Sequence, residues 1–294
     1  MASRDIWSEW LLERRFGGDA VQLKRLLDQL APIRDRVLAG AALKDGETLL
    51  DVGCGDGLIA FGALHAHAGV NAVFSDISAS LLEHARQLGA DAQLLHRCTF
   101  VEAPAENLSP IGDSSVDAVT TRSVLIYVDR KEDALREFHR VLKPGGRLSM
   151  FEPINIFGYE QPETSFWGLD VTPVIEAANK LKAQTRSLQP PESDPMFNFD
   201  ERDLLLMVQD AGFAEVQMDY EVRITRWDET EWTALINQAP NPKLPTWTEA
   251  MDQVLTPAEK DAFIAHVRPQ VEQRQGIDRS AHVFLRATSA KKMA

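Results

Sequence analysis

The segment Leu49–Gly57, which reads LLDVGCGDG, constrains this chain more than any other part of its sequence. An apolar run ends at Gly53, Gly55 and Gly57, and the helix-forming segment 58–61 follows directly. This pattern predicts a buried strand, a sharp turn and a helix whose N-terminus faces a crevice. Glycine permits positive φ and lets a ligand approach the backbone closely. The G-x-G-x-G spacing differs from the G-x-G-x-x-G of dinucleotide-binding loops, which argues against NAD and FAD.

A carboxylate closes the next apolar run. Asp76 follows Val73–Ser75, about 20 residues beyond the glycines, where a second parallel strand would place an acid against ribose hydroxyls. The alternative role for Asp76 is an N-cap for the following helix, and Ser78 is equally suited to that role. The glycines and the acid together predict a cofactor that contains a ribose.

Five segments, in order, resemble the class I S-adenosylmethionine-dependent methyltransferases. They are LLDVGCGDG (49–57), VFSDISASLLEHAR (73–86), EAPAENL (102–108), VDAVTTRSVLIYV (116–128) and LREFHRVLKPGGRLSMFEP (135–153). The last one joins a basic amphipathic helix, a turn at Lys143–Gly146 and a strand. The resemblance implies an α/β fold, a Rossmann-like seven-stranded methyltransferase sheet that is mostly parallel with its last strand antiparallel. It implies S-adenosyl-L-methionine as cofactor and S-adenosyl-L-homocysteine as product, but it does not identify the methyl acceptor.

Changes of pattern along the chain predict four parts. Residues 1–45 form an N-terminal helical cover, which in related enzymes often lies over the cofactor. Residues 46–153 alternate strands and helices and form the Rossmann-like core. Residues 154–200 form an insertion, and 201–294 carry the remaining core strands with a helical insertion at about 226–280. We expect the insertions to cap the acceptor site, and a homodimer interface is their competing use.

The composition and net charge of the chain limit the classes of partner that it is expected to bind. The chain has 44 acidic and 31 basic residues, a net charge of −13, which opposes binding to nucleic acid. Cys54 and Cys98 are the only cysteines, so neither a disulfide framework nor a metal site is predicted. The N-terminus lacks the apolar core of a signal peptide, and no apolar run is long enough to span a membrane. We therefore expect a cytoplasmic protein.

The resemblance assigns cofactor binding to Asp51, Gly53, Gly55, Gly57, Asp76, Ile77, Ala105, Glu106, Thr121 and Arg122. Asp51 is expected to orient the loop and to meet the amino group, Asp76 to bind the ribose and Ile77 to pack on adenine. Thr121 and Arg122 end the fourth strand and approach the methionine end of the cofactor. Arg122 is suited to pair with the cofactor carboxylate, and a structural role is its alternative.

One position departs from the family pattern. The family commonly has an acid near the adenine amino group in the loop after the third strand. Aligning Ala105–Leu108 with that motif puts Pro104 at the usual acidic position. Adenine recognition is therefore left to Glu102, to Glu106 or to backbone groups.

The loops expected to face the acceptor carry Tyr127 after the fourth strand and Glu152, Asn155 and Tyr159 after the fifth. Glu152 is the candidate acid because it ends a strand at the ligand-bearing edge, although it is also suited to hold the turn at Pro153. Further candidates for the lining of the cap are Trp167, Asp170, Met196, Phe197 and Asp200. No histidine falls in these loops, so no general base is evident.

These observations predict a methyltransferase that acts on a small organic acceptor in specialised metabolism. The missing histidine base favours C- or N-methylation over O-methylation. An O-methyltransferase is one alternative. The other is a protein that binds S-adenosylmethionine without transferring its methyl group and acts through its insertions.

Overall fold

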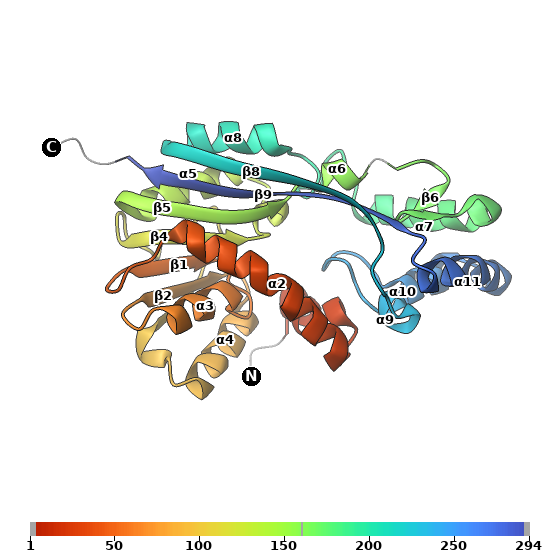
Figure 1. Ribbon diagram of the computed structural model, residues 1–294, viewed down its shortest axis with the longest axis horizontal. Helices are drawn as coiled ribbons and strands as arrows, with labels where there is room; N and C mark the ends of the chain where they lie inside the picture. Colours follow the sequence, from red (N-terminus) through yellow and green to blue (C-terminus); the bar gives the residue numbers. More distant parts are fainter. Residues whose placement is uncertain (1–3, 160, 291–294) are drawn as a thin grey trace.

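The computed structural model describes residues 4–159 and 161–290. Its centre is a seven-stranded sheet with the order β3-β2-β1-β4-β5-β9-β8 (Figure 1). Its strands are β1 (Thr48–Val52), β2 (Asn71–Asp76), β3 (Cys98–Glu102), β4 (Val116–Arg122), β5 (Leu142–Pro153), β8 (Phe213–Arg226) and β9 (Ile277–Ser289). Strand β9 is antiparallel to both of its neighbours, and the other adjacent strands are parallel. The predicted sheet, with its last strand antiparallel, is confirmed.

Helices cover both faces of the sheet. The α-helices are α1 (Ile6–Leu12), α2 (Ala20–Ala41), α3 (Leu58–Ala66), α4 (Ala79–Asp91), α5 (Lys131–Val141), α6 (Ile156–Tyr159), α7 (Ile175–Leu188), α8 (Glu201–Asp210), α9 (Trp232–Ile236), α10 (Trp247–Val254) and α11 (Pro257–Glu272). Short 3₁₀ turns are η1 (Arg14–Phe16), η2 (Leu95–Arg97), η3 (Leu125–Tyr127) and η4 (Thr172–Val174). Helices α2, α3 and α4 pack on one face, and α5 and α8 on the other (Figure 1). No helix in the described ranges combines the length and apolar character needed to cross a membrane.

The central strand β1 explains why the sequence is so apolar before the glycines. Leu49 and Leu50 point to opposite faces of the sheet, and the exposed fraction of each side chain is 0%. A parallel strand covered by helices on both faces has no solvent side, so it lacks the alternation of a half-exposed strand. The glycine loop therefore begins at the end of a strand that lies in the middle of the core.

The segment Lys143–Gly146 differs from its prediction. It is not a turn before the fifth strand, because β5 already begins at Leu142. Gly145 has φ of 78°, and the pairing of β5 with β4 shifts register between Val116 and Ala118. Residues 143–146 pair with neither β4 nor β9, so the glycine lies in a bulge between two paired stretches of β5.

The two segments outside the core pack on each other. The first carries α6, α7 and the small hairpin of β6 (Ser165–Phe166) with β7 (Leu169–Asp170); the second, between β8 and β9, carries α9, α10 and α11. The Phe166 ring lies 5.1 Å from that of Trp247 and 5.6 Å from that of Phe263, between centroids. The two segments share one buried apolar cluster. The predicted part boundaries stay a prediction.

Candidate active site

The glycine loop lies between β1 and α3 at the carboxyl edge of the sheet. Gly53, Gly55 and Gly57 have φ of 62°, 56° and 85°, a region that other residues rarely adopt. A Cβ on Gly57 would lie 2.7 Å from the ring of Phe61 and 2.8 Å from that of Phe74. The loop therefore requires glycine both for its conformation and for its packing.

Asp51 ties this loop to the sheet. Its buried carboxylate accepts hydrogen bonds from the Ala60 N–H at 3.1 Å and from the Thr120 hydroxyl at 3.0 Å. Burial raises the pKa of Asp51 to about 7, although these hydrogen bonds and the charge of Arg122 act to lower it. Asp51 thus joins the start of α3 to β4, and its roles in orienting the loop and contacting the cofactor amino group stay predictions.

Asp76 holds the loop from the other side. One carboxylate oxygen accepts from the Gly55 N–H and the other from the Ser78 N–H, both at 2.9 Å. The hydroxyl of Ser78 accepts from the Leu81 N–H at 3.0 Å, so Ser78 is the N-cap of α4. Burial raises the pKa of Asp76. Ile77 next to it is exposed, as a residue that packs on a ligand ring would be.

The N-terminal cover lies directly on the loop. The Leu11 Cδ2 atom lies 3.0 Å from the position that a Cβ on Gly55 would take. The rings of Trp7 and Trp10 meet the Tyr127 ring edge-on, with centroids 5.0 and 6.5 Å apart. Helix α1 therefore closes the space between the glycine loop and the turn after β4.

Arg15 of η1 lies close enough to Arg122, at the end of β4, for the two positive charges to interact. Burial and the charge of Arg122 lower the pKa of Arg15 to about 10, and Asp56 and Tyr127 act in the opposite direction. Among the ion pairs formed within residues 4–159 and 161–290, none includes Arg15 or Arg122. The sequence points to Arg122 but not to Arg15, because no motif marks a basic residue in an N-terminal segment.

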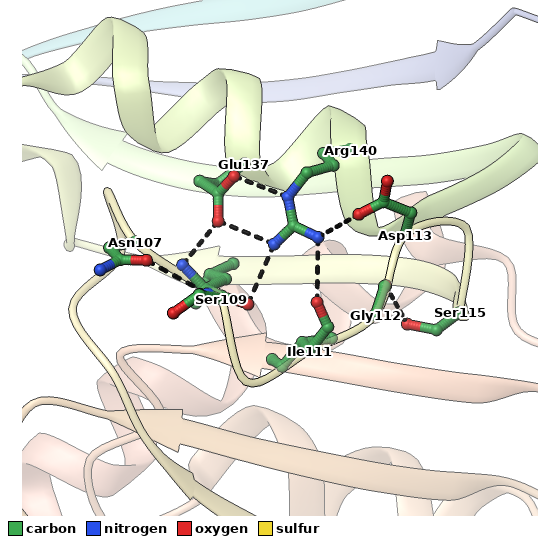
Figure 2. Close-up of polar contacts among 9 residues, drawn as sticks. Asn107, Ser109, Ile111, Gly112, Asp113, Ser115, Glu137 and Arg140 are labelled. Atoms are coloured by element: carbon green, nitrogen blue, oxygen red, sulfur yellow. Dashed lines mark hydrogen bonds and ion pairs between the residues drawn. The ribbon is translucent and has the colours of Figure 1, made fainter.

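The loop that follows β3 is fastened to α5 by two side chains (Figure 2). Arg140 donates to the carbonyl oxygens of Leu108 and Ile111, each at 3.0 Å. The Glu137 carboxylate accepts from the Leu108 N–H at 2.6 Å and also pairs with Arg140. This brace fixes the loop in which the sequence predicts adenine recognition.

Within that loop, the candidate residues have different surroundings. Ala105 is buried and Glu106 is partly exposed, whereas Glu102 is exposed at the end of β3. The carbonyl oxygen of Pro104 accepts from the Asn107 N–H at 3.0 Å, which closes a turn. Which of these groups contacts adenine stays a prediction.

Both oxygens of the Glu152 carboxylate accept hydrogen bonds from backbone N–H groups. It accepts from the N–H groups of Val124 at 2.9 Å, Leu125 at 3.1 Å and Ile126 at 3.4 Å. Burial raises the pKa of Glu152 to about 7, and the three hydrogen bonds act to lower it. Glu152 thus joins the end of β5 to η3, the turn that carries Tyr127. Its predicted contact with the acceptor stays a prediction.

A cavity of about 1190 Å³ opens at the carboxyl end of β5. Both insertions and the first residues of β9 form its walls. Of the residues predicted to face the acceptor, it is lined by Asn155, Tyr159, Trp167, Met196 and Phe197. Asp170 and Asp200 instead accept hydrogen bonds at the starts of η4 and α8. Tyr127 belongs to the cluster under α1, where burial raises its pKa to about 12.

Three buried polar atoms at this edge have no hydrogen-bond partner among the described residues, Ser75 Oγ, Thr121 Oγ1 and Asn155 Nδ2. Thr121 lies near the end of β4, and Asn155 follows β5, its neighbour in the sheet. A buried polar group without a partner costs about 1–3 kcal/mol. These atoms fit a site in which cofactor and acceptor supply the missing partners.

The comparisons with known proteins agree with this geometry. A family described as "Methyltransferase domain" matches residues 50–150. The ubiquinone/menaquinone biosynthesis C-methyltransferase UbiE of Paracoccus denitrificans is 31% identical over 197 residues, covering 65% of this chain and 72% of that relative. The chain belongs to the class I S-adenosylmethionine-dependent methyltransferases.

Other matches cover different shares of this chain. The chain spans about half the length of the first curated relatives it matches. UbiE of Cereibacter sphaeroides is 37% identical over 119 residues, 40% of this chain and 47% of that relative. Geranyl diphosphate C-methyltransferase of Streptomyces coelicolor A3(2), solved with Mg²⁺, geranyl-S-thiolodiphosphate and S-adenosyl-L-homocysteine, has a TM-score of 0.50 at 18% identity, covering 88% of this chain and 76% of that chain. At that identity the likeness establishes the fold.

Proposed function

We propose that this protein transfers the methyl group of S-adenosylmethionine to a carbon atom of a small organic acceptor. The observation that carries the proposal is the cavity of about 1190 Å³ at the carboxyl end of β5. The neighbouring strand in the sheet is β4, which ends at Arg122. The choice of carbon is supported by the names of the relatives, which are C-methyltransferases. The proposal does not depend on N- or O-methylation or on a role in specialised metabolism.

The residues at the sheet edge fit the cofactor. When bound, S-adenosylmethionine supplies an activated methyl group, and S-adenosylhomocysteine remains after transfer. The glycine loop and Asp76 would hold its ribose and methionine portions, with Ile77 against adenine. Thr121 would donate its unpartnered hydroxyl, and Arg122 would pair with the carboxylate.

The contribution of the chain to catalysis is alignment and exclusion of water. Trp7 and Tyr127 close one side of the site, and Glu152 keeps the turn of Tyr127 in place. Asn155 would donate its free amide N–H to an oxygen of the acceptor. Each of these groups fixes geometry, so proximity would supply most of the acceleration.

The histidines support a carbon acceptor. His282 contacts the Glu221 carboxylate at 3.2 Å, and His139 packs on Phe213, so neither faces the cavity. No histidine in the described ranges lines the cavity. An electron-rich carbon attacks before it loses its proton and can release that proton to water after transfer, whereas a hydroxyl group has to lose its proton first.

The cavity walls suggest a large acceptor with a flat or isoprenoid part. Tyr159, Trp167, Phe197 and Trp227 give the cavity an aromatic surface. Its volume lies just above the usual range for ligand sites, which is about 300–1,000 Å³. The chemistry fits quinol-like or isoprenoid-like molecules.

The first test is titration with S-adenosylhomocysteine in a calorimeter, in which we expect one-to-one binding with a dissociation constant near about 1 μM. The second is incubation with methyl-labelled S-adenosylmethionine and a panel of quinols, phenols and prenyl compounds. We expect label in a product whose new methyl group is bonded to carbon, as its ¹³C chemical shift shows. Absence of binding would refute the function, and binding without transfer to any acceptor would favour the non-transferring alternative.

A further inference from the structure

Strand β8 forms one edge of the sheet, and one side of its backbone pairs with no strand in the described residues. It spans Phe213–Arg226, and in the described residues its only strand partner is β9. The pairing with β9 runs from Phe213 opposite Ser289 to Arg226 opposite Ile277. A long edge strand presents a row of unpaired backbone N–H and C=O groups to another chain.

The half of β8 farther from Phe213 also exposes apolar side chains. Tyr220, Val222 and Ile224 are exposed by 39%, 45% and 55%. They alternate along the strand and therefore share one face of the sheet. Helix α8 packs beside the first half of β8 and leaves this stripe uncovered (Figure 1). Exposed apolar side chains beside an open strand edge mark an association surface.

We propose that the occupant of this edge is a second copy of the same chain, with the two β8 strands antiparallel about a twofold axis at Val222. Such an interface is self-complementary, as in most homodimers. In this register each Val222 faces the Val222 of the other copy, and each Tyr220 faces Ile224. Aromatic and β-branched side chains opposite each other stabilise an antiparallel pair.

The charges on the other face of β8 fit the same register. It places Glu221 of each copy opposite Arg223 of the other, so two identical ion pairs form. Arg223 is exposed, and it has no ion pair among those formed within the described ranges. Glu221 is partly exposed and already contacts Arg36 and His282 of its own chain.

Neighbouring registers of the two β8 strands set like charges opposite each other. Shifting the axis to Glu221 sets two carboxylates opposite each other, and shifting it to Arg223 does the same for two guanidinium groups. Like charges directly opposite each other destabilise a strand pair. The apolar and the charged faces of β8 thus select one register, which is what favours a second copy over an unrelated partner.

The dimer would also brace the acceptor cavity. Residues 277–281 of β9 line that cavity and pair with residues 222–226 of β8. A partner strand on the outer side of β8 would restrict the motion of this ribbon. The interface would therefore stabilise one wall of the site without adding a residue to it.

The test is the mass of the full-length protein in solution, by light scattering and sedimentation at several concentrations. We expect wild type at twice the chain mass of 32.8 kDa. Arg223→Glu replaces both ion pairs with like charges and should raise the dimer dissociation constant roughly tenfold or more. Arg226→Glu is the matched control, because the register places Arg226 opposite Met218. Circular dichroism and the thermal midpoint verify that each variant is folded.

Cross-linking tests the register independently. Under mild oxidation Val222→Cys should form a disulfide with its own copy, whereas Thr225→Cys, opposite Asp219, should not. Monomeric wild type would overturn the proposal. So would a dimer that Arg223→Glu leaves unchanged, or Thr225→Cys cross-linking as readily as Val222→Cys. None of these readouts depends on cofactor binding or on methyl transfer.

Discussion

The Asp76 carboxylate accepts a hydrogen bond from the Gly55 N–H at 2.9 Å, across 21 positions of the chain. This contact joins the end of β2 to the turn after β1. The acid that the sequence predicts for ribose binding therefore also holds the glycine loop. Ser78, and not Asp76, caps the helix that follows.

Asp76→Ala should weaken S-adenosylhomocysteine binding by about 1–3 kcal/mol, because it leaves the Gly55 N–H and the ribose hydroxyls without their acceptor. Calorimetric titration measures this loss. Ser78→Ala is the control: it removes the N-cap of α4 and should cost about 1 kcal/mol of unfolding free energy while leaving affinity unchanged. If Asp76→Ala binds like wild type, Asp76 serves only to hold the loop.

The affinity for S-adenosylhomocysteine should rise with pH. The pKa of Asp51 is about 7 because of burial, so its carboxyl group is mostly protonated near about pH 6 and mostly ionised near about pH 8. Only the ionised form attracts the ligand ammonium group. We expect affinity to fall by up to about tenfold per pH unit below the pKa.

Two variants separate the contributions to this pH dependence. Asp51→Asn should bind weakly and should lose most of the pH dependence, since its side chain does not titrate. Glu152 also has a pKa of about 7, so Glu152→Gln reports how much of the profile belongs to that second carboxyl. A wild-type affinity that is constant across this range would contradict the role of Asp51.

Local backbone chemistry explains what the sequence predicted well. Gly53, Gly55 and Gly57 form a turn that few other residues tolerate, and the short distance between β1 and α3 leaves little choice of conformation. The same holds for the alternation of strands and helices in the core. The sequence also offered Ser78 as an alternative N-cap, and its hydroxyl does accept a hydrogen bond from the nearby Leu81 N–H.

Contacts between distant segments explain what was missed. Arg140 reaches Leu108 across 32 positions, and Arg15 comes within electrostatic range of Arg122 only because the N-terminal segment folds back over the glycine loop. Such contacts depend on the completed fold and leave no periodic pattern. The segment Lys143–Gly146 was predicted to precede the fifth strand, but Leu142 already pairs with Val116 of β4, a contact between distant segments that the local sequence does not encode.

Glu152 should make the stability of the unliganded protein depend on pH. Its pKa in the fold is about 7, above the ordinary value of 4.5, so folding favours the protonated carboxyl group. The resulting stabilisation is complete below about pH 4.5 and is lost as the pH rises through about 7, by on the order of 3 kcal/mol. Glu152→Gln should reduce this slope in thermal unfolding, and Asp51, which has the same sign, should retain part of it.

The same variant tests how Glu152 affects methyl transfer. If Glu152 acts through η3 and Tyr127, or on the acceptor itself, Glu152→Gln should lower turnover more than cofactor affinity. Steady-state rates with the identified acceptor, together with titrations of S-adenosylhomocysteine, give the two quantities. A variant with unchanged turnover and weakened cofactor binding would place Glu152 in the cofactor site instead.

Arg15 should contribute to binding of the cofactor carboxylate together with Arg122, since two neighbouring guanidinium groups without a carboxylate partner favour an anion between them. Arg15→Ala should weaken S-adenosylhomocysteine binding about tenfold or more, the worth of one hydrogen bond to a charged group. It should leave the binding of 5′-methylthioadenosine unchanged, because that ligand keeps the adenosine and lacks the amino-acid portion. Arg25→Ala, on the exposed side of α2, removes the same charge and should change neither affinity. Equal losses for both ligands would mean that Arg15 acts only by holding α1 over the loop.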